Sequence, residues 1–516
     1  MSDCTFVLEP LAKSELTSLA NLPNINYTNQ DFHSMKTRLV GFIQEKFIED
    51  FNDFVEGSLA VMLIENWAFL ADTLSFKMDQ IVNELFIDTV SELENAFRLC
   101  KIVGMNPTPP IASKALMSAT IQTPLETDLV IPGGLVLDIP TNGLTLTYEL
   151  FPADSLDNPI FEQDITIPNG QLTNTSIVGL EGRTVVDNFS GTGLPNQIYT
   201  LGTFPVLFDS IRVDVDGQRW NKVDFFTDSK GRNEYRVDFT STWTGFVIFG
   251  NGQAGRSPSV GSQISVTYRT GGGTRGNIVT GFVGTQRGFQ VPGFNFSVPV
   301  TFRNYTKGDF GYNGDTLDDI RRKLPRYVKA QDRAVTGEDY KTLADQFVSA
   351  YNGQVGKSLA VLRNYGCAAN IIDLYVLARD GSDGLIEASD NLKTELMEYM
   401  ETKKMLTDYL CIRDGVIILV DVILGVTVDK FYKKFKEEIE KKLTQKIISF
   451  FGLPNWEYGK TLRETELLRY VSDMKEVKFV DATFTTNDPD NGGSIVTSRY
   501  YEIIRLDNLT INLVFE

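Results

Sequence analysis

Two glycine-rich spacings lie between Phe249 and Asn277, and glycines at such spacings can bind a phosphate group. Residues 250–257 read GNGQAGRS and match the G-x-x-x-x-G spacing of a phosphate loop, but Arg256 stands where that motif requires a lysine. A planar guanidinium does not replace the compact ammonium that reaches the β- and γ-phosphates. The first spacing therefore argues against an ATP or GTP site.

The second spacing uses Gly271, Gly273 and Gly276, which satisfy G-x-G-x-x-G after the strand-like residues 264–269. A dinucleotide site needs a helix directly after such glycines, because the helix N-terminus supplies amide donors and a favourable dipole. Residues 277–283 read NIVTGFV instead, and β-branched residues favour a strand or a loop. We therefore expect tight turns between antiparallel strands, and an ATP-binding assay would test the alternative of a nucleotide-driven assembly factor.

Acid–base and nucleophilic chemistry have few side chains to use in this sequence. His33 is the only histidine, so a histidine-based triad could form only around it, and a multi-histidine metal site is excluded. Its place at a helix start suits a cap or a surface residue. Two carboxylate doublets, Asp318 with Asp319 and Glu464 with Glu466, consist of neighbours that point away from each other on a helix. We expect solvated charges at both doublets and no catalytic residues.

Metal and cofactor sites are not predicted either. Residues 309–315 imitate a calcium loop, but they lack an oxygen ligand at the third position, and Ile320 occupies the twelfth, where a bidentate glutamate belongs. The cysteines form no C-x-x-C pair, so isolated buried thiols are expected at Cys4, Cys100, Cys367 and Cys411. We predict no metal, no cofactor and no enzymatic activity.

The charge of the chain restricts its partners. There are 49 Lys+Arg against 67 Asp+Glu in 516 residues, a formal charge of -18, which repels nucleic acid. One basic run is interleaved with aspartates on a predicted helix, where it suits a solvated face or an acidic partner: Arg321, Arg322, Lys323, Arg326, Lys329 and Arg333. No stretch of eighteen apolar residues and no signal-peptide pattern is found, so we expect no membrane contact and folding in a cytoplasm.

Three helices are predicted near the N-terminus, over residues 31–47, 58–86 and 90–103. The middle helix has apolar residues spaced by threes and fours, and a second row every seven residues, a stripe wider than one neighbour covers. We expect it to be packed on two sides, by its own domain, by another protomer or by a different protein. The candidate subunit-interface residues are Met62, Leu63, Trp67, Phe69, Leu70, Leu74, Phe76 and Met78.

The remaining sequence predicts an α+β multidomain protein. After an N-terminal helical region, residues 1–112, short strands separated by Gly, Pro, Asn and Asp predict a central antiparallel β-rich region over 113–300. Capping boxes at Thr316 and Thr336 then open helices, and strands alternate with helices to the end of the chain. We expect small α+β sandwich domains over 301–414 and 415–516, the last of which could carry dimerisation.

Taken in order, four groups of residues resemble the baseplate J-like family, the inner wedge proteins of contractile phage tails and related injection machines. The groups are Glu65, Ala71-Asp72, Asn83-Glu84 and Thr89 before GMNP at 104–107; FGNGQAG at 249–255 with Pro258, Gly261 and YRTGGGTRGN at 268–277; RAVTGEDY at 333–340; and WEYG at 456–459 before TELL at 465–468. Residues 150–245 and those beyond 480 match no pattern of the family. The length resembles the larger, T-even-like wedge type.

The resemblance implies a structural role in a virion. Wedges would close into a ring around the tail tube, assembled in the host cytoplasm, and would take part in the contraction trigger. The implied partners are copies of this chain, as a dimer within the ring, other wedge subunits bound through the N-terminal helices, and the tail hub or the sheath-initiating subunit.

A glycan-binding or glycan-degrading tail protein is the main alternative to this structural role. Such a protein needs an exposed aromatic platform beside paired carboxylates. The tryptophans available for one, Trp220, Trp243 and Trp456, are scattered in the sequence, although folding could gather them.

Overall fold

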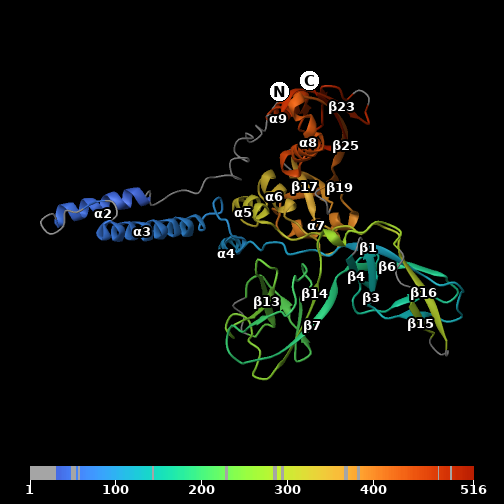
Figure 1. Cartoon of the computed structure of the whole chain (residues 1–516). Helices are drawn as coiled ribbons and strands as arrows, with labels where there is room; N and C mark the ends of the chain where they lie inside the picture. The colour runs from blue at the N-terminus through green and yellow to red at the C-terminus, as the bar shows by residue number, and fades with distance from the viewer. Residues whose placement is uncertain are drawn as a thin grey trace. The chain divides into compact units, whose positions relative to one another are not determined.

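A computed structural model describes residues 31–47, 54–55, 58–141, 144–226, 231–282, 287–291, 296–364, 370–380, 384–474, 476–488 and 491–515. The fold is N-terminal helices, then antiparallel β-sheets, then mixed α/β elements, as the sequence predicts (Figure 1). The chain divides into two compact units. The first joins residues 1–107 to residues 315–328, and the second contains residues 108–314 and 329–516.

The first unit is helical. Its helices are α2 (Phe32–Lys46), α3 (Leu59–Asn83), α4 (Leu93–Val103) and most of α5 (Leu317–Ala330). The predicted helix starts are confirmed, since Ser58 caps α3 and the Thr316–Asp319 capping box opens α5. Gly104 ends α4 in the left-handed conformation, with φ of 79°.

The second unit begins with a six-stranded antiparallel sheet in the order β15-β16-β1-β6-β4-β3. Its strands, with the separate β2–β5 pair, are β1 (Lys114–Thr120), β2 (Leu129–Ile131), β3 (Leu135–Thr141), β4 (Leu144–Pro152), β5 (Ile165–Ile167), β6 (Thr173–Glu181), β15 (Arg287–Gln290) and β16 (Ser297–Asn304). Alternate residues such as Met117, Leu137 and Phe302 are buried in one apolar core.

Between β6 and β15 the chain forms two four-stranded sheets, ordered β10-β9-β14-β7 and β11-β12-β13-β8. The strands are β7 (Arg183–Ser190), β8 (Ile198–Thr200), β9 (Arg212–Val215), β10 (Gln218–Arg219), β11 (Asn221–Lys222), β12 (Glu234–Phe239), β13 (Gly245–Phe249) and β14 (Gln263–Thr270). Side chains from both sheets, including Trp220, Phe249 and Tyr268, share one core. The predicted hairpin about Asp216 and Gly217 is confirmed, and both residues have positive φ.

The glycine-rich stretch makes turns, but the prediction that these turns join paired antiparallel strands is wrong. The loop after β13 leads to β14 in the other sheet, so it connects two sheets. Gly271 has φ of 135°, and a Cβ there would lie 2.6 Å from the Gly182 Cα. The next amide, from Gly272, donates to the buried carboxylate of Glu181. These glycines allow two backbone segments to approach closely, and the short 3-10 turn η2 (Thr274–Gly276) follows them.

The rest of the second unit contains two α+β layers. In the first, α6 (Gly337–Asp345) and α7 (Asp390–Glu401) pack on a sheet of β17 (Val355–Asn364), β18 (Asn370–Arg379), β19 (Leu385–Glu387) and β20 (Asp408–Asp414). In the second, α8 (Lys436–Phe450) and α9 (Glu464–Ser472) pack on β21 (Val416–Val428), β23 (Val477–Thr486) and β25 (Glu502–Phe515). The short elements are η3 (Lys430–Phe435), η4 (Leu453–Asn455), β22 (Leu462–Arg463) and β24 (Ile495–Val496).

Both α+β layers contain parallel strand pairs, β18 with β20 and β21 with β25. A charge cluster joins the layers. Glu457 accepts hydrogen bonds from Lys357, at 2.7 Å, and from Lys341, at 2.9 Å. Burial opposes ionisation of Glu457, but the two ammonium groups outweigh that effect and lower its pKa to about 2.

The Glu457 cluster predicts a pH-dependent loss of stability. A carboxylate with a lowered folded pKa stabilises the protein above its unfolded pKa of about 4.5, and this contribution disappears as the pH falls toward 2. Because the Glu457 side chain is 42% exposed and solvent weakens its ion pairs, Glu457→Gln should cost about 1 kcal/mol at neutral pH. The difference from the native chain should shrink steadily below pH 4.5, as measured by urea unfolding.

Glu438→Gln is the matched control, because Glu438 pairs with Lys442 on the exposed surface of α8. Its cost should be a few tenths of a kcal/mol. Equal costs for the two variants, or a Glu457→Gln cost that does not change with pH, would contradict the assignment.

Candidate subunit interface

Helix α3 buries two β-branched apolar side chains near its start and small or polar side chains along the rest of its length. The residues buried on this helix are Val61, Ile64, Ala68, Ser75, Asp79 and Asn83. At the C-terminal end of the helix, the Thr89 hydroxyl donates a hydrogen bond to the Asn83 carbonyl oxygen at 2.6 Å. A helix usually buries its large apolar side chains, whereas most of those on α3 are exposed.

The eight side chains predicted for the interface all lie on the outside of α3. Their exposed fractions range from 47% at Leu70 to 66% at Phe76, and Trp67 is 64% exposed. No single apolar side chain on a surface is unusual, but a continuous row of large ones marks a contact surface. The structure thus places these residues where a partner could reach them, and their role in an interface stays a prediction.

Helix α2 lies beside α3 in the first unit (Figure 1). The Lys36 ammonium pairs with the Glu65 carboxylate at 2.7 Å and joins the two helices. Asp31 caps α2 through a reciprocal bond pair with Ser34. Because the ion pair is partly exposed, it contributes only about 0.2–1 kcal/mol and serves mainly to orient the helices.

Helix α5 completes the helical unit, although more than two hundred residues separate it from α4. The Arg321 guanidinium donates to the Val90 carbonyl oxygen, and the Tyr327 hydroxyl donates to the Gly104 carbonyl oxygen at 3.3 Å. Ile320, on the same helix, is fully buried. These contacts hold both ends of the α4 segment.

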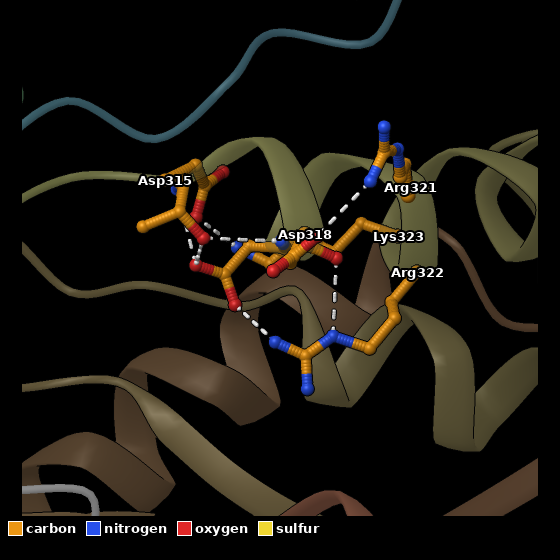
Figure 2. Close-up of polar contacts among 7 residues, drawn as sticks. Asp315, Asp318, Arg321, Arg322 and Lys323 are labelled. Carbon is orange, nitrogen blue, oxygen red and sulfur yellow. Dashed lines mark hydrogen bonds and ion pairs between the residues drawn. The ribbon is translucent and has the colours of Figure 1, made fainter. Parts of the chain in front are cut away.

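The first turns of α5 form a compact charge network (Figure 2). Lys323 pairs with the buried Asp315 at 2.6 Å, and Arg321 pairs with the exposed Asp318 at 3.2 Å. Arg322 pairs with Asp319 at 2.6 Å. Three of the six predicted basic residues are therefore engaged inside the chain's own helix and its flank, which leaves less charge for an outside partner.

Two expectations about individual side chains are wrong. Asp319 is not a solvated charge, because it caps α5 through Thr316 and its side chain is only 12% exposed. Cys411 is exposed and not buried, since it lies on the uncovered face of β20. Cys100 is buried as expected, while Cys4 and Cys367 lie outside the described residues.

The thiol of Cys100 lies in the region where α4 meets α5. Burial, with a smaller contribution from the negative charge of Asp315, raises its pKa to about 12 against an opposing effect of Lys323. A thiol that is both buried and protonated reacts slowly with disulfide reagents, because the thiolate is the nucleophile. Cys100 therefore reports whether α5 stays in place.

Other residues singled out from the sequence show no reactive arrangement. His33 is exposed near the start of α2, as predicted. Trp220, Trp243 and Trp456 are each buried, so these three tryptophans form no exposed platform for a glycan. Within the described ranges, no group of three His, Cys, Asp or Glu side chains is placed to hold a metal ion.

One helix among the described residues, α3, is long and apolar enough to cross a membrane by length and composition. Only 22% of its most apolar window is buried. The sequence predicts no membrane contact, and length and composition alone are weak evidence for a membrane span.

The thiol of Cys100 gives a test of the contact between α5 and α4. In a chain whose other three cysteines are serine, Arg321→Ala should raise the rate of Cys100 modification by Ellman's reagent at pH 8 about tenfold. The reason is the loss of a charge-assisted hydrogen bond to Val90, which holds the α4 segment closed. Arg326→Ala, at an exposed position of α5, is the control, and equal rates in both variants would refute the role given to Arg321.

The comparisons with known proteins bear on the helical unit. Residues 31–102 match the family model described as the N-terminal domain of a bacteriophage baseplate protein. That range contains α2 and α3 and nearly all of α4. A search of the curated proteins gives no match.

Two solved structures share a weak likeness with the chain. One is from the baseplate of the anti-feeding prophage, with a TM-score of 0.35, 13% identity, and coverage of 98% of this chain and 100% of that chain. The other is from the TssK-TssF-TssG baseplate subcomplex of the type VI secretion system, with a TM-score of 0.30, 10% identity, and coverage of 69% and 96%. Neither score is high enough to bear on fold or function. The family match supports a structural baseplate protein, and it does not single out the J-like wedge family.

Proposed function

We propose that this chain is a structural subunit of the baseplate wedge of a contractile phage tail or of a related injection device. It links wedges into a ring around the tail tube and takes part in baseplate assembly and in the contraction trigger. The observation that carries the proposal is the exposed apolar surface of α3, which lies inside the segment that matches a baseplate N-terminal domain. The proposed location is the tail baseplate of the virion, after assembly in the host cytoplasm.

The surface of α3 is suited to association with other subunits. Large apolar side chains on one exposed helix are unfavourable in water, and burying each one fully gains roughly 1.5–3 kcal/mol. Trp67 stands near the middle of this surface, and tryptophan is enriched among the residues that dominate binding energies. We therefore assign α3 to contacts with other wedge subunits. A position in the ring around the tail tube would also allow contact with the tail hub or the sheath-initiating subunit.

The wedge assignment predicts that Trp67→Asp prevents this chain from co-purifying with its wedge subunits. A carboxylate at a buried contact position would be desolvated without a partner, which costs several kcal/mol and should lower affinity by a hundredfold or more. Asn66→Asp is the control, since it adds the same charge at a neighbouring exposed position outside the apolar rows. An intact complex containing Trp67→Asp, with the circular dichroism of both variants unchanged, would sink the proposal.

Self-association is assigned to the C-terminal α+β layer. One face of the sheet β23-β21-β25 is covered by α8 and α9, whereas the opposite face exposes Leu419, Ile423 and Phe479. Thr427 and Thr483 lie among them in the strand register. A half-apolar sheet face of this kind matches the composition of a protein interface.

Phe479→Asp should convert a dimer of the full chain into a monomer, as measured by light scattering on a sizing column. The aspartate would leave an unpaired charge in the contact. Each proposed surface controls the other: Phe479→Asp should keep binding of wedge subunits, and Trp67→Asp should keep the dimer. A chain that is monomeric without substitution at high concentration would count against self-association through this sheet.

A further inference from the structure

Asp373 is buried although it lies on the face of the β17-β18-β20 sheet that the helices leave open. Its neighbours on β18, Ile372 and Leu374, pack with α6 and α7, so the Asp373 side chain points to the opposite face. Its register partner on β20, Cys411, is exposed, whereas the Asp373 side chain is 0% exposed. A buried carboxylate is unfavourable without partners, and two arginines supply them.

Arg363 and Arg413 approach Asp373 from the strands on either side of β18. The Arg413 Nε donates to Asp373 Oδ1 at 2.8 Å, and the Arg363 Nε lies 2.6 Å from Oδ2. These contacts use Nε, and the Arg363 and Arg413 side chains remain 51% and 48% exposed, so their terminal nitrogens can bind a further ligand. Asp373 thus holds two guanidinium groups close together, and one positive charge is left in excess.

Three tyrosines lie beside the arginine pair. Tyr375 interacts with Arg363, and its ring stacks on Tyr501 and meets Tyr500 edge-on, with centroids 5.8 Å apart in both contacts. The Tyr501 hydroxyl accepts a hydrogen bond from Arg499 at 2.9 Å, and the Arg499 side chain is 74% exposed. Tyr409, on β20, is also exposed. We call the exposed members of this group the arginine face: Arg363, Arg413, Arg499, Tyr409 and Tyr500.

The arginine face presents positive charge in a chain whose net charge is -18. The carboxylates that pair with its arginines, Asp373 and Glu502, are 0% and 16% exposed, so a ligand meets mainly the guanidinium groups. Guanidinium groups bind carboxylates through parallel hydrogen bonds, and tyrosine and arginine are enriched in protein interfaces. The arginine face is therefore complementary to an acidic protein segment.

A segment with several carboxylates fits this face better than a single anion or a nucleic acid. Each exposed ion pair contributes little because solvent screens it, so a lone anion makes too few contacts. A nucleic acid carries its charge far beyond the face, and the excess of acidic residues in the chain repels it. A short acidic segment contacts the positive face alone, since screening limits electrostatic effects to about 8 Å at physiological salt.

We propose that the arginine face binds an acidic segment of another protein. The terminal nitrogens of Arg363 and Arg413 bind carboxylates of the segment, Arg499 binds a further one, and Tyr409 packs against the aliphatic parts of its side chains. Asp373 is a positioning residue, because it holds together two guanidinium groups that would otherwise repel each other. The proposal does not depend on the wedge assignment, since the arginine face lies in the second unit and α3 in the first.

The probe is rhodamine-labelled hexaglutamate, whose binding to the full chain is measured by fluorescence anisotropy at low salt. Arg363→Gln and Arg413→Gln should each weaken binding about tenfold, through the loss of charge-assisted hydrogen bonds. Arg256→Gln removes the same charge at an exposed position outside this sheet, so it is the matched control and should change binding by less than about twofold. Arg413→Lys keeps a positive charge beside Asp373 but loses the planar fork, so it should keep the urea midpoint and still weaken binding about fivefold.

Cys411 gives a readout at the face itself, because it is exposed and lies in register with Asp373. In a chain whose other three cysteines are serine, hexaglutamate at ten times its Kd should slow modification of Cys411 by iodoacetamide about tenfold, since about one chain in ten stays free. Arg413→Gln should remove this protection at the same peptide concentration.

Four results would overturn the proposal. The first is no binding at about 1 mM hexaglutamate, or binding that leaves Cys411 unprotected. The second is equal protection by inorganic phosphate, which would show a site for single anions. The third is tighter binding of a single-stranded DNA hexamer with the same dependence on Arg363 and Arg413. The fourth is a dimer that Arg413→Gln dissociates without any peptide, which would assign the face to a second copy of this chain.

Discussion

The helical unit depends on one constraint, which is that α3 leaves most of its large apolar side chains exposed and buries Val61, Ile64 and several small or polar side chains instead. Small residues such as Ala68 and Ser75 allow neighbouring backbone to come close, and Asn83 ties the helix end through Thr89. The eight exposed apolar side chains named for α3 could gain on the order of 10 kcal/mol when covered. Association itself costs a comparable amount, so the surface becomes stable only with extensive coverage.

The polar contacts of α5 hold the α4 segment, which follows α3 in the chain. Arg321 and Tyr327 bind backbone carbonyls at the two ends of the α4 segment. In the second unit, a buried ion pair connects two sheets. Arg269, on β14, pairs with Glu149 and donates to two carbonyl oxygens of β6 in the neighbouring sheet. Buried pairs of this type are costly to break, because one lost partner leaves a charge without water.

Local signals in the sequence predicted local structure well. The capping boxes at Thr316 and Thr336, the glycine that ends α4 and the hairpin at Asp216 all act within a few residues, and each is confirmed. The exposed row on α3 could also be read from spacing alone. Which surface that row meets could not, because apolar periodicity marks a face without stating whether the covering side chains come from the same chain.

Long-range pairings were beyond the sequence. The glycine-rich stretch suggested tight turns between antiparallel strands. Glycines fix the bend but not the destination of the following strand, and β14 pairs with β7 and β9. The ion pairs of α5 were also missed at the level of sequence. The pair of Arg322 with Asp319 follows from their spacing of three residues on a helix. The burial of Asp315 and the hydrogen bond from Arg321 to Val90 depend on tertiary contacts, which the sequence does not show.

The order of the elements along the chain has a consequence for folding. Helix α5 follows the whole β region, so the helical unit lacks its closing element until residues 315–328 have been synthesised. Domains fold as their residues become available, and exposed apolar surface on incomplete units promotes aggregation. The contacts of α5 with the α4 segment therefore form only after the β region has been synthesised.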